Sequence, residues 1–361
     1  MKILVRAPNW VGDAVMSIPT LEVIRRYRTA SEITILARTA VADLLSGQPF
    51  ADRILEYDYR GRHRGWLGRE KLVRELRNEK FDLAVLLQNA FEAAWLAWRS
   101  GIPERIGYAR DGRGALLTKS IALPKPGHDG RMFPRHESQY YLELLRRAGW
   151  LKSRGEIDPI QAIQLTVPEM ARGAAELKLR KAGARPRSWR CAVAPGASYG
   201  AAKCWPAERF ALLADRLISE CDADVLFFGT GGEKEIATRI FSVMKSRAIS
   251  LVGETSMRDL PALFSQCSVF VGNDSGAMHV AAAAGLPVIG IFGSTDPEGT
   301  APVTQQFTLI QEKVPCSPCF LRRCPVDHRC MTRISVDSVF SAIRHSGHMP
   351  TDLQARSAEN A

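Results

Sequence analysis

The segment 268–293, SVFVGNDSGAMHVAAAAGLPVIGIFG, limits what this chain can fold into more than any other. Its pattern predicts a strand over 269–271, a polar loop, a helix of small residues over 277–284 and, after a turn with Gly285 and Pro287, a second buried strand. Strand, helix and strand in this order form a βαβ unit, which belongs to a parallel sheet with right-handed crossovers. The polar loop therefore lies at the carboxyl end of a strand, where open α/β sheets bind ligands.

Three polar side chains gather at the start of that helix, those of Asp274, Ser275 and His279. The first N–H groups of a helix have no partner inside it, so they attract an anion. We therefore expect an anionic ligand at this loop. The alternative is that Asp274 only caps the helix and that His279 lies at the surface.

The same alternation of strands and helices runs along the chain and predicts an α/β fold with two Rossmann-like halves. Further strands are expected over 2–6, 33–37, 53–57 and 82–87 in the first half, and over 190–197, 223–229 and 249–253 in the second. Residues 151–189 contain several Gly and Pro around one helix over 169–181, which indicates a linker. We expect an N-terminal domain over 1–175, a C-terminal domain over 186–346 and a polar, disordered tail over 347–361.

The chain of 361 residues carries a formal net charge of +11, which indicates an acidic partner. Positive charge is concentrated in 58–80, with eight Lys or Arg against four Asp or Glu, and in 99–135, with eight against three. We expect such loops to bind anions, above all through Arg60, Arg62 and Arg64, because a guanidinium matches carboxylate and phosphate by two-point contact. A solvated surface is the alternative. No recognition motif for nucleic acid accompanies the charge.

Three further charged residues follow predicted strands: Asp13, Lys203 and Glu233. Lys203 comes after a loop of small residues and can neutralise a diphosphate, although the spacing is not that of a P-loop. Glu233 follows a Gly-rich turn and can bond ribose or sugar hydroxyls. Helix capping is the alternative role for both acids. Only Gly12 stands where a dinucleotide-binding turn has three glycines, which argues against a nicotinamide or flavin cofactor.

Four of the eight cysteines are concentrated near the C-terminus, as Cys316-x2-Cys319-x4-Cys324-x5-Cys330. They could hold a structural, tetrahedral zinc ion, or they are reduced thiols in a loop. Because the cluster follows the last ligand-binding motif, we expect it to lie outside the ligand site. Neither a secretory signal nor a membrane-spanning apolar run is visible, which predicts a cytoplasmic protein.

Several long motifs resemble, in the same order, those of the bacterial ADP-heptose:lipopolysaccharide heptosyltransferases, and within them the type II branch. They are RAPNWVGDAVMS (6–17), RSGIPERIGYARDGRGALLT (99–118), APGASYGAAKCWP (194–206), FGTGGE (228–233), GNDSGAMHVAAAAGLPVIGIFGSTDP (272–297) and CSPCFLRRCPVDHRCM (316–331). The resemblance covers nearly the whole chain. It implies an inverting glycosyltransferase of GT-B architecture, in which two Rossmann-like parallel-sheet domains face a central cleft.

The resemblance also implies the substrates and the role of each site residue. The donor is ADP-L-glycero-β-D-manno-heptose, and the acceptor is the first heptose on the Kdo-lipid A inner core, at the cytoplasmic face of the inner membrane. Asp13 corresponds to the general base, Lys203 to the lysine on the donor phosphates and Glu233 to the acid that binds the donor nucleoside. The donor loop corresponds to Asp274, Ser275, Gly276 and His279, and Ser198 offers a hydroxyl where relatives often have threonine; the role of Tyr199 stays open.

Catalysis then needs no metal ion or other cofactor, because Lys203 and a helix start neutralise the leaving diphosphate. Phosphates and carboxylates of the acceptor lipopolysaccharide would explain the basic loops better than nucleic acid does. Two alternatives remain: a member of the family with a different acceptor, such as heptosyltransferase I, and a non-catalytic protein that binds a nucleotide sugar.

Overall fold

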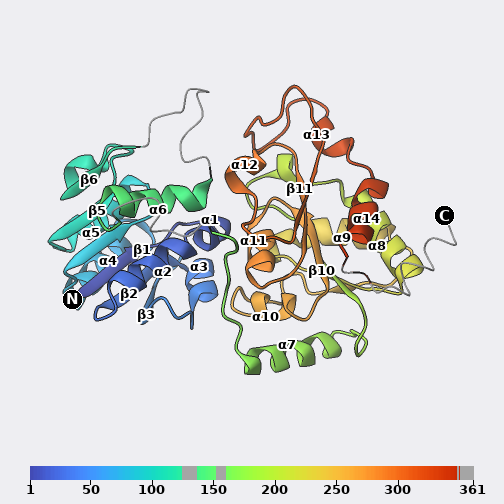
Figure 1. Cartoon of the computed structure of the whole chain (residues 1–361), viewed down its shortest axis with the longest axis horizontal. Coiled ribbons are helices and arrows are strands. Elements are labelled where there is room, and N and C mark those ends of the chain that lie inside the picture. The colour runs from blue at the N-terminus through green and yellow to red at the C-terminus, as the bar shows by residue number, and fades with distance from the viewer. Residues whose placement is uncertain (124–135, 152–159, 348, 350–361) are drawn as a thin grey trace. The chain divides into compact units, whose positions relative to one another are not determined.

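The computed structural model describes residues 1–123, 136–151, 160–347 and 349. The chain divides into two compact units, Met1–Ile160 and Gln161–Ala361. Each unit is built around one six-stranded sheet (Figure 1), and the strand pairs of both sheets are parallel. The predicted α/β fold with two Rossmann-like parallel-sheet domains is therefore confirmed.

The first unit arranges its strands in the order β3-β2-β1-β4-β5-β6. These strands are β1 (Lys2–Arg6), β2 (Glu32–Arg38), β3 (Arg53–Tyr57), β4 (Leu83–Leu86), β5 (Glu104–Tyr108) and β6 (Lys119–Ile121). The helices are α1 (Val11–Met16), α2 (Ile18–Tyr27), α3 (Thr39–Leu45), α4 (Gly65–Glu79), α5 (Phe91–Arg99), the 3-10 helix η1 (Arg113–Leu116) and α6 (Glu137–Arg147). The strand order reverses between β1 and β4, and open α/β sheets bind ligands at such switch points.

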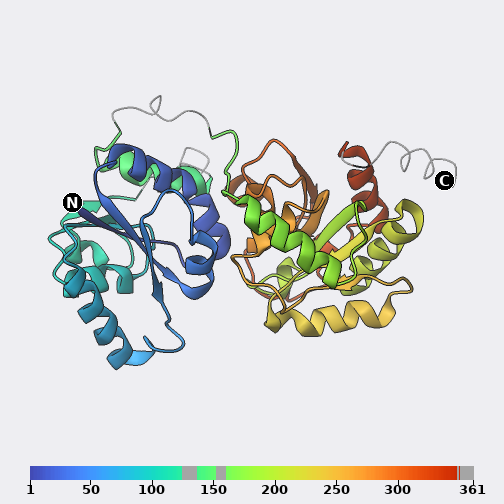
Figure 2. The same ribbon diagram turned by 90° about the horizontal axis from the view of Figure 1, so that it is seen from below.

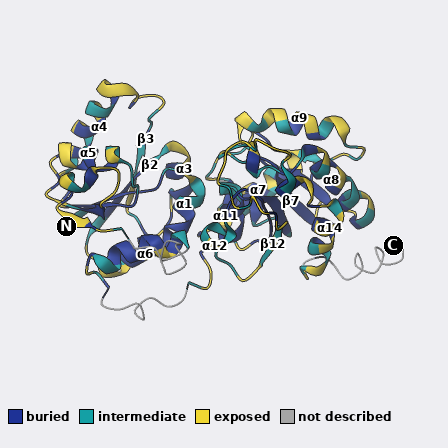
Figure 3. Ribbon diagram, turned by 90° about the horizontal axis from the view of Figure 1, so that it is seen from above, coloured by how far each residue is buried: buried dark blue, intermediate teal, exposed yellow. Residues whose placement is uncertain are grey.

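Helices cover both faces of this sheet, which is why its central strands are continuous apolar runs. β1 and β4 are buried along almost their whole length (Figure 3). α2 packs on α6, and α4 packs on α5. α1 and α2 are separated at Ser17, because Pro19 has no N–H to donate to the carbonyl one turn earlier.

The second unit repeats the arrangement, in the order β12-β11-β10-β7-β8-β9, with its switch point between β10 and β7. Its strands are β7 (Arg190–Ala194), β8 (Asp224–Phe227), β9 (Ile249–Ser250), β10 (Val269–Asn273), β11 (Val288–Phe292) and β12 (Phe307–Gln311). Its helices are α7 (Glu169–Lys181), η3 (Ala201–Lys203), α8 (Ala207–Cys221), η4 (Gly231–Glu233), α9 (Lys234–Val243), α10 (Leu260–Phe264), α11 (Gly276–Ala283), α12 (Pro297–Thr300), α13 (Arg329–Thr332) and α14 (Val336–His345).

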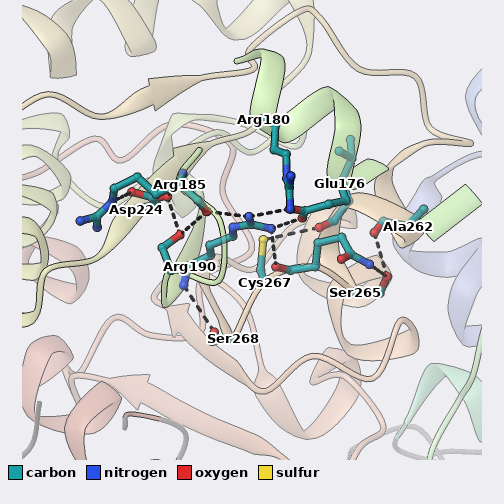
Figure 4. A network of polar contacts seen from close by, with 12 residues as sticks. Glu176, Arg180, Arg185, Arg190, Asp224, Ala262, Ser265, Cys267 and Ser268 are labelled. Carbon is teal, nitrogen blue, oxygen red and sulfur yellow. Dashed lines mark hydrogen bonds and ion pairs between the residues drawn. The ribbon is translucent and has the colours of Figure 1, made fainter. Parts of the chain in front are cut away.

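Charged side chains attach helix α7 to this second sheet (Figure 4). Arg190 at the start of β7 donates to Glu176 of α7, with 2.5 Å between Nη1 and Oε2, and this bond lowers the pKa of Glu176 to about 2. Arg185 donates from Nε to Oδ1 of Asp224 over 2.8 Å. α7 also packs on α10, and Figure 2 shows α7 in green along the second unit. The segment 151–189 was expected to be the linker, with the first domain reaching residue 175, whereas α7 is packed into the second unit.

The C-terminal residues contribute to the second core. Val339, Phe340 and Ile343 of α14 are buried in it, as is Met349. Of the tail expected to be disordered, 347–361, only Gly347 and Met349 are among the described residues. No helix that the structure describes is both long and apolar enough to cross a membrane.

Candidate functional site

The loops that follow β7 and β10 are joined by one buried side chain, that of Asn273. This residue ends β10 and is fully buried. Its Oδ1 accepts from the amide of Trp205 over 2.9 Å, and its Nδ2 donates to the carbonyl of Pro195 over 2.7 Å. Asn273 therefore fixes the loop 195–205, which contains Lys203, against the switch point of the sheet. Asn273 was expected only as part of the polar loop after the strand 269–271, but its place beside Asp274 at the end of a buried strand is a signal for such a role.

Lys203 and Asp274, both expected at the site, form a buried ion pair there. Nζ of Lys203 lies 2.5 Å from Oδ2 of Asp274, and the two side chains are 12% and 5% exposed. Thr295, which follows β11, donates its hydroxyl to the same oxygen over 2.6 Å. Asp274 thus does not cap α11 but holds the ammonium group of Lys203 in place. Thr295 was not predicted, although it belongs to the motif that runs on from β11.

The start of α11 provides further hydrogen-bond donors. Ser275 is the N-cap residue, and no side chain caps the helix. The hydroxyl of Ser275 is buried and has no hydrogen-bond partner among the described residues. The amides that begin at Gly276 therefore remain for a ligand, and an anion is favoured there. His279 is buried on the same helix rather than lying at the surface.

Glu233 performs the capping role that was its alternative assignment, and it does so next to the β7 loop. Its Oε2 accepts from the amide of Thr230 over 2.6 Å and from the Thr230 hydroxyl over 2.9 Å. Its Oε1 lies so close to Gly196 that a Cβ at residue 196 would be 1.7 Å away. Only glycine allows this approach, which brings the carboxylate to the loop after β7. Ser198 lies exposed in that same loop.

In the first unit, Asp13 occupies the first turn of α1, directly after β1. Glu137 at the start of α6 is close enough to interact with it: burial, followed by the charge of Asp13, raises the pKa of Glu137 to about 7. Burial and the same two acids also raise the pKa of Tyr141. Glu137 could not be predicted from the sequence, because nothing in a single acid at the start of an amphipathic helix marks it as a neighbour of residue 13.

The three arginines expected to bind anions, Arg60, Arg62 and Arg64, are all exposed in the loop between β3 and α4. Asp58 shapes this loop: Oδ1 accepts from the amide of Gly61 over 2.8 Å, and Oδ2 accepts from that of Arg62 over 2.9 Å. Buried His63 anchors it, since its Nδ1 accepts from the amide of Asp58 over 3.1 Å. The loop is thus held in place by its own hydrogen bonds, and the guanidinium of Arg62 also donates from Nη2 to the carbonyl of Glu56 over 3.1 Å.

In the second basic stretch, 99–135, two arginines bond to the backbone, whereas the loops of this stretch were expected to bind anions. Arg113 is fully buried, and its Nε donates to the carbonyl of Tyr108 over 2.8 Å. Arg105 donates from Nε to the carbonyl of Leu116 over 2.7 Å. These two guanidinium groups therefore support the backbone of the first unit instead of binding an outside anion.

The cysteine-rich segment, 314–331, surrounds a cavity of about 230 Å³. All four of its cysteines line this cavity, together with residues such as Ser294 and His328. The cysteines are free thiols. In the part of the chain that the structure describes, no three His, Cys, Asp or Glu side chains are placed to hold a metal ion. The structural zinc ion stays a prediction.

This segment contacts the loop that carries Lys203 and the loop that carries Thr295, whereas it was expected to lie apart from the ligand site. Its Ser317 hydroxyl donates to the carbonyl of Gly293 over 2.5 Å, and the amide of Phe320 donates to the carbonyl of Ser294 over 2.8 Å. On the other side, Nε2 of His328 lies 2.9 Å from the carbonyl of Ala202. The segment thus links the loop that carries Thr295 to the loop that carries Lys203.

Comparison with known proteins identifies the family. The model for glycosyltransferase family 9 (heptosyltransferase) matches residues 69–329. Lipopolysaccharide heptosyltransferase 2 of Escherichia coli K12 is 30% identical over 86% of this chain and 88% of its own length. Lipooligosaccharide heptosyltransferase 2 of Haemophilus influenzae is also 30% identical, with the same coverage.

Solved structures agree with these relatives. The structure of the E. coli ADP-heptose lipopolysaccharide heptosyltransferase II is similar with a TM-score of 0.78, at 26% identity, and the match covers 100% of both chains. A family 9 glycosyl transferase from Veillonella parvula has the same fold, with a TM-score of 0.81 at 22% identity over 96% of each chain. The predicted glycosyltransferase is confirmed: the chain belongs to glycosyltransferase family 9, the heptosyltransferases.

Proposed function

We propose that this enzyme transfers L-glycero-D-manno-heptose from ADP-heptose to the first heptose of the lipopolysaccharide inner core. The observation that carries the proposal is the buried Lys203–Asp274–Thr295 cluster beside the uncapped start of α11, at the switch point of the second unit. Such a site suits the diphosphate of a nucleotide sugar. The type 2 relatives support the choice of acceptor.

In this proposal the donor's diphosphate lies between Lys203 and the first amides of α11. Ser275 supplies a buried hydroxyl for it, and His279 lies one turn further along the same helix. Glu233 and Ser198 bind hydroxyls of the ribose or sugar, because the close approach of Glu233 to Gly196 places its carboxylate at the loop after β7.

The first unit supplies the base. Asp13 removes the proton from the acceptor hydroxyl, whose oxygen attacks the anomeric carbon as the bond to the β-phosphate breaks and ADP leaves. The raised pKa of Glu137 keeps that neighbouring carboxyl largely protonated below about pH 7, so Glu137 adds little negative charge beside Asp13. Lys203 and the amides of α11 stabilise the charge that grows on the leaving diphosphate.

The exposed arginines 60, 62 and 64 are the part of the first unit best suited to the acceptor, whose inner core bears phosphate and carboxylate groups. We place the enzyme at the cytoplasmic face of the inner membrane for the same reason, since an anionic surface attracts a chain with a net charge of +11.

The decisive experiment offers ADP-heptose with two acceptors, Kdo-lipid A with and without its first heptose, and measures the ADP released. Turnover with the heptosylated acceptor alone supports the proposal, whereas turnover only with the other acceptor indicates a type I enzyme. Asp13→Asn should bind ADP-heptose normally but lower turnover by about 10² to 10⁴, the range for a lost general base. Donor binding without turnover on either acceptor would instead indicate a non-catalytic binding protein.

A further inference from the structure

Arg322 of the cysteine-rich segment is packed directly on the loop that carries Lys203. The carbonyl of Arg322 accepts from the amide of Ala202 over 3.1 Å. Gly200 has a φ of +155°, and a Cβ at this position would lie 2.4 Å from the same carbonyl oxygen. A side chain at residue 200 would therefore push Arg322 away, and the backbone of Arg322 is held at a fixed place beside the loop.

Tyr199 brings the two cations to one aromatic ring. Nζ of Lys203 lies 4.9 Å from the centroid of this ring, and the guanidinium carbon of Arg322 lies 5.4 Å from it. The Tyr199 hydroxyl donates to the carbonyl of Phe320 over 2.6 Å, so the ring itself is fixed to the cysteine-rich segment. Cations are attracted to the ring, but two of them near one ring repel each other unless an anion joins them.

The charges of Lys203 and Arg322 are balanced differently. Lys203 forms a buried ion pair with Asp274. Arg322 is exposed, and none of the ion pairs recorded for the described residues includes it. A diphosphate brings two phosphate groups, more negative charge than one ammonium group already paired with a carboxylate can neutralise. Arg322, whose guanidinium lies over Tyr199 beside this loop, offers a positive charge that no ion pair among the described residues neutralises.

We propose that Arg322 is a second cation for the donor's diphosphate, and that binding this group is the role of the cysteine-rich segment in the reaction. The inference rests on the proposed function, in which the diphosphate lies at Lys203. A guanidinium can hold two phosphate oxygens at once, and it strengthens its hold as the leaving group gains charge. Tyr199 then positions both cations, which gives a role to a residue whose function the sequence left open.

The test is Arg322→Gln, with Arg323→Gln as the matched control. Both side chains are exposed and adjacent in the sequence, but only that of Arg322 stacks on Tyr199. Calorimetry should show that Arg322→Gln weakens ADP binding by about 10- to 100-fold, as expected for one charge-assisted contact, while binding of adenosine is unchanged. Arg323→Gln should bind both ligands like the wild type. Arg322→Lys should recover part of the ADP affinity, because lysine keeps the positive charge but cannot hold two phosphate oxygens at once as a guanidinium does.

Three results would overturn the inference. The first is unchanged ADP affinity in Arg322→Gln. The second is an equal loss for ADP and adenosine together with a lower melting temperature, which would make Arg322 a structural support of the loop. The third is an equal effect of Arg323→Gln, which would indicate general surface charge. Lys203→Ala, measured alongside, tests the proposed function separately: if it weakens ADP while Arg322→Gln does not, only the present inference fails.

Discussion

Replacing Asn273 tests whether one buried amide organises the donor loops. In Asn273→Leu the side chain keeps a similar size but loses both polar groups, so the amide of Trp205 and the carbonyl of Pro195 stay buried without their partners. Each such orphaned group costs about 1–3 kcal/mol. The free energy of unfolding should therefore fall by roughly 2–6 kcal/mol, and ADP binding should weaken as well, because Lys203 lies in the released loop.

The assay is urea denaturation followed by circular dichroism, with and without ADP. Because the two units can unfold in separate transitions, the transition that ADP shifts identifies the unit that binds it. Asn273→Asp provides a finer test. Its ionised carboxylate still accepts from Trp205 but faces the Pro195 carbonyl with an oxygen, so the variant should be unstable at pH 7 and partly recover at low pH, where the protonated carboxyl can donate.

Thr34→Val is the control for a buried polar group that makes no bond. Thr34 is fully buried and its hydroxyl has no partner in the described structure, so the change should be neutral within about 0.5 kcal/mol. The reasoning fails if Asn273→Leu is as harmless as Thr34→Val, or if it destabilises the chain without any effect on ADP affinity.

Four further outcomes are expected. The pKa of Glu137 is about 7 in the fold against 4.5 for an ordinary glutamate, so the native state binds the extra proton and stability falls as pH rises from about 4.5 to 7. Glu137→Gln should remove up to about 3 kcal/mol of that fall, measured by denaturation curves at pH 5 and pH 8, and a variant with the same pH dependence as the wild type would contradict this. Lys203→Ala should cost stability by leaving Asp274 buried and unpaired, and adding Asp274→Asn should restore stability but not ADP affinity, as melting and calorimetry would reveal. Alanine at the three arginines of the 60–64 loop should raise KM for the acceptor only, and equal damage with an uncharged acceptor would mean a structural loop. If the four cysteines bind zinc, metal analysis should find about one equivalent, and chelation should loosen the segment without stopping turnover; metal-free protein with four titratable thiols would refute zinc.

The sequence predicted the fold well where buried parallel strands made continuous apolar runs. β1, β3 and α7 have the predicted limits, and the βαβ unit around α11 is present. The strands β5, β6 and β12 were not predicted; β5 begins with Glu104 and Arg105, and β6 has only three residues, of which the first is Lys119. The same reasoning found Lys203 and Asp274, since each follows a strand at the switch point.

The parts of the site that could not be predicted depend on contacts between distant segments. Nothing local marks Glu137 as a neighbour of Asp13, or Arg322 as a neighbour of Tyr199. The arginines of 99–135 illustrate the opposite error. Arg113 stands in a Gly-flanked loop, which suggested an anion site, but its buried guanidinium donates hydrogen bonds to backbone carbonyls inside the fold.

The contacts of the cysteine-rich segment also bear on how the enzyme is made. Every residue we assign to the donor, apart from Arg322, precedes residue 296, and residues 317–328 add a second link between the loops that carry Lys203 and Thr295, besides the one through Asp274. A chain still on the ribosome would therefore contain all those donor residues before this second link could form. We therefore expect the nascent enzyme to reach its full affinity for ADP-heptose only after residues 317–328 have been made and have packed on these loops.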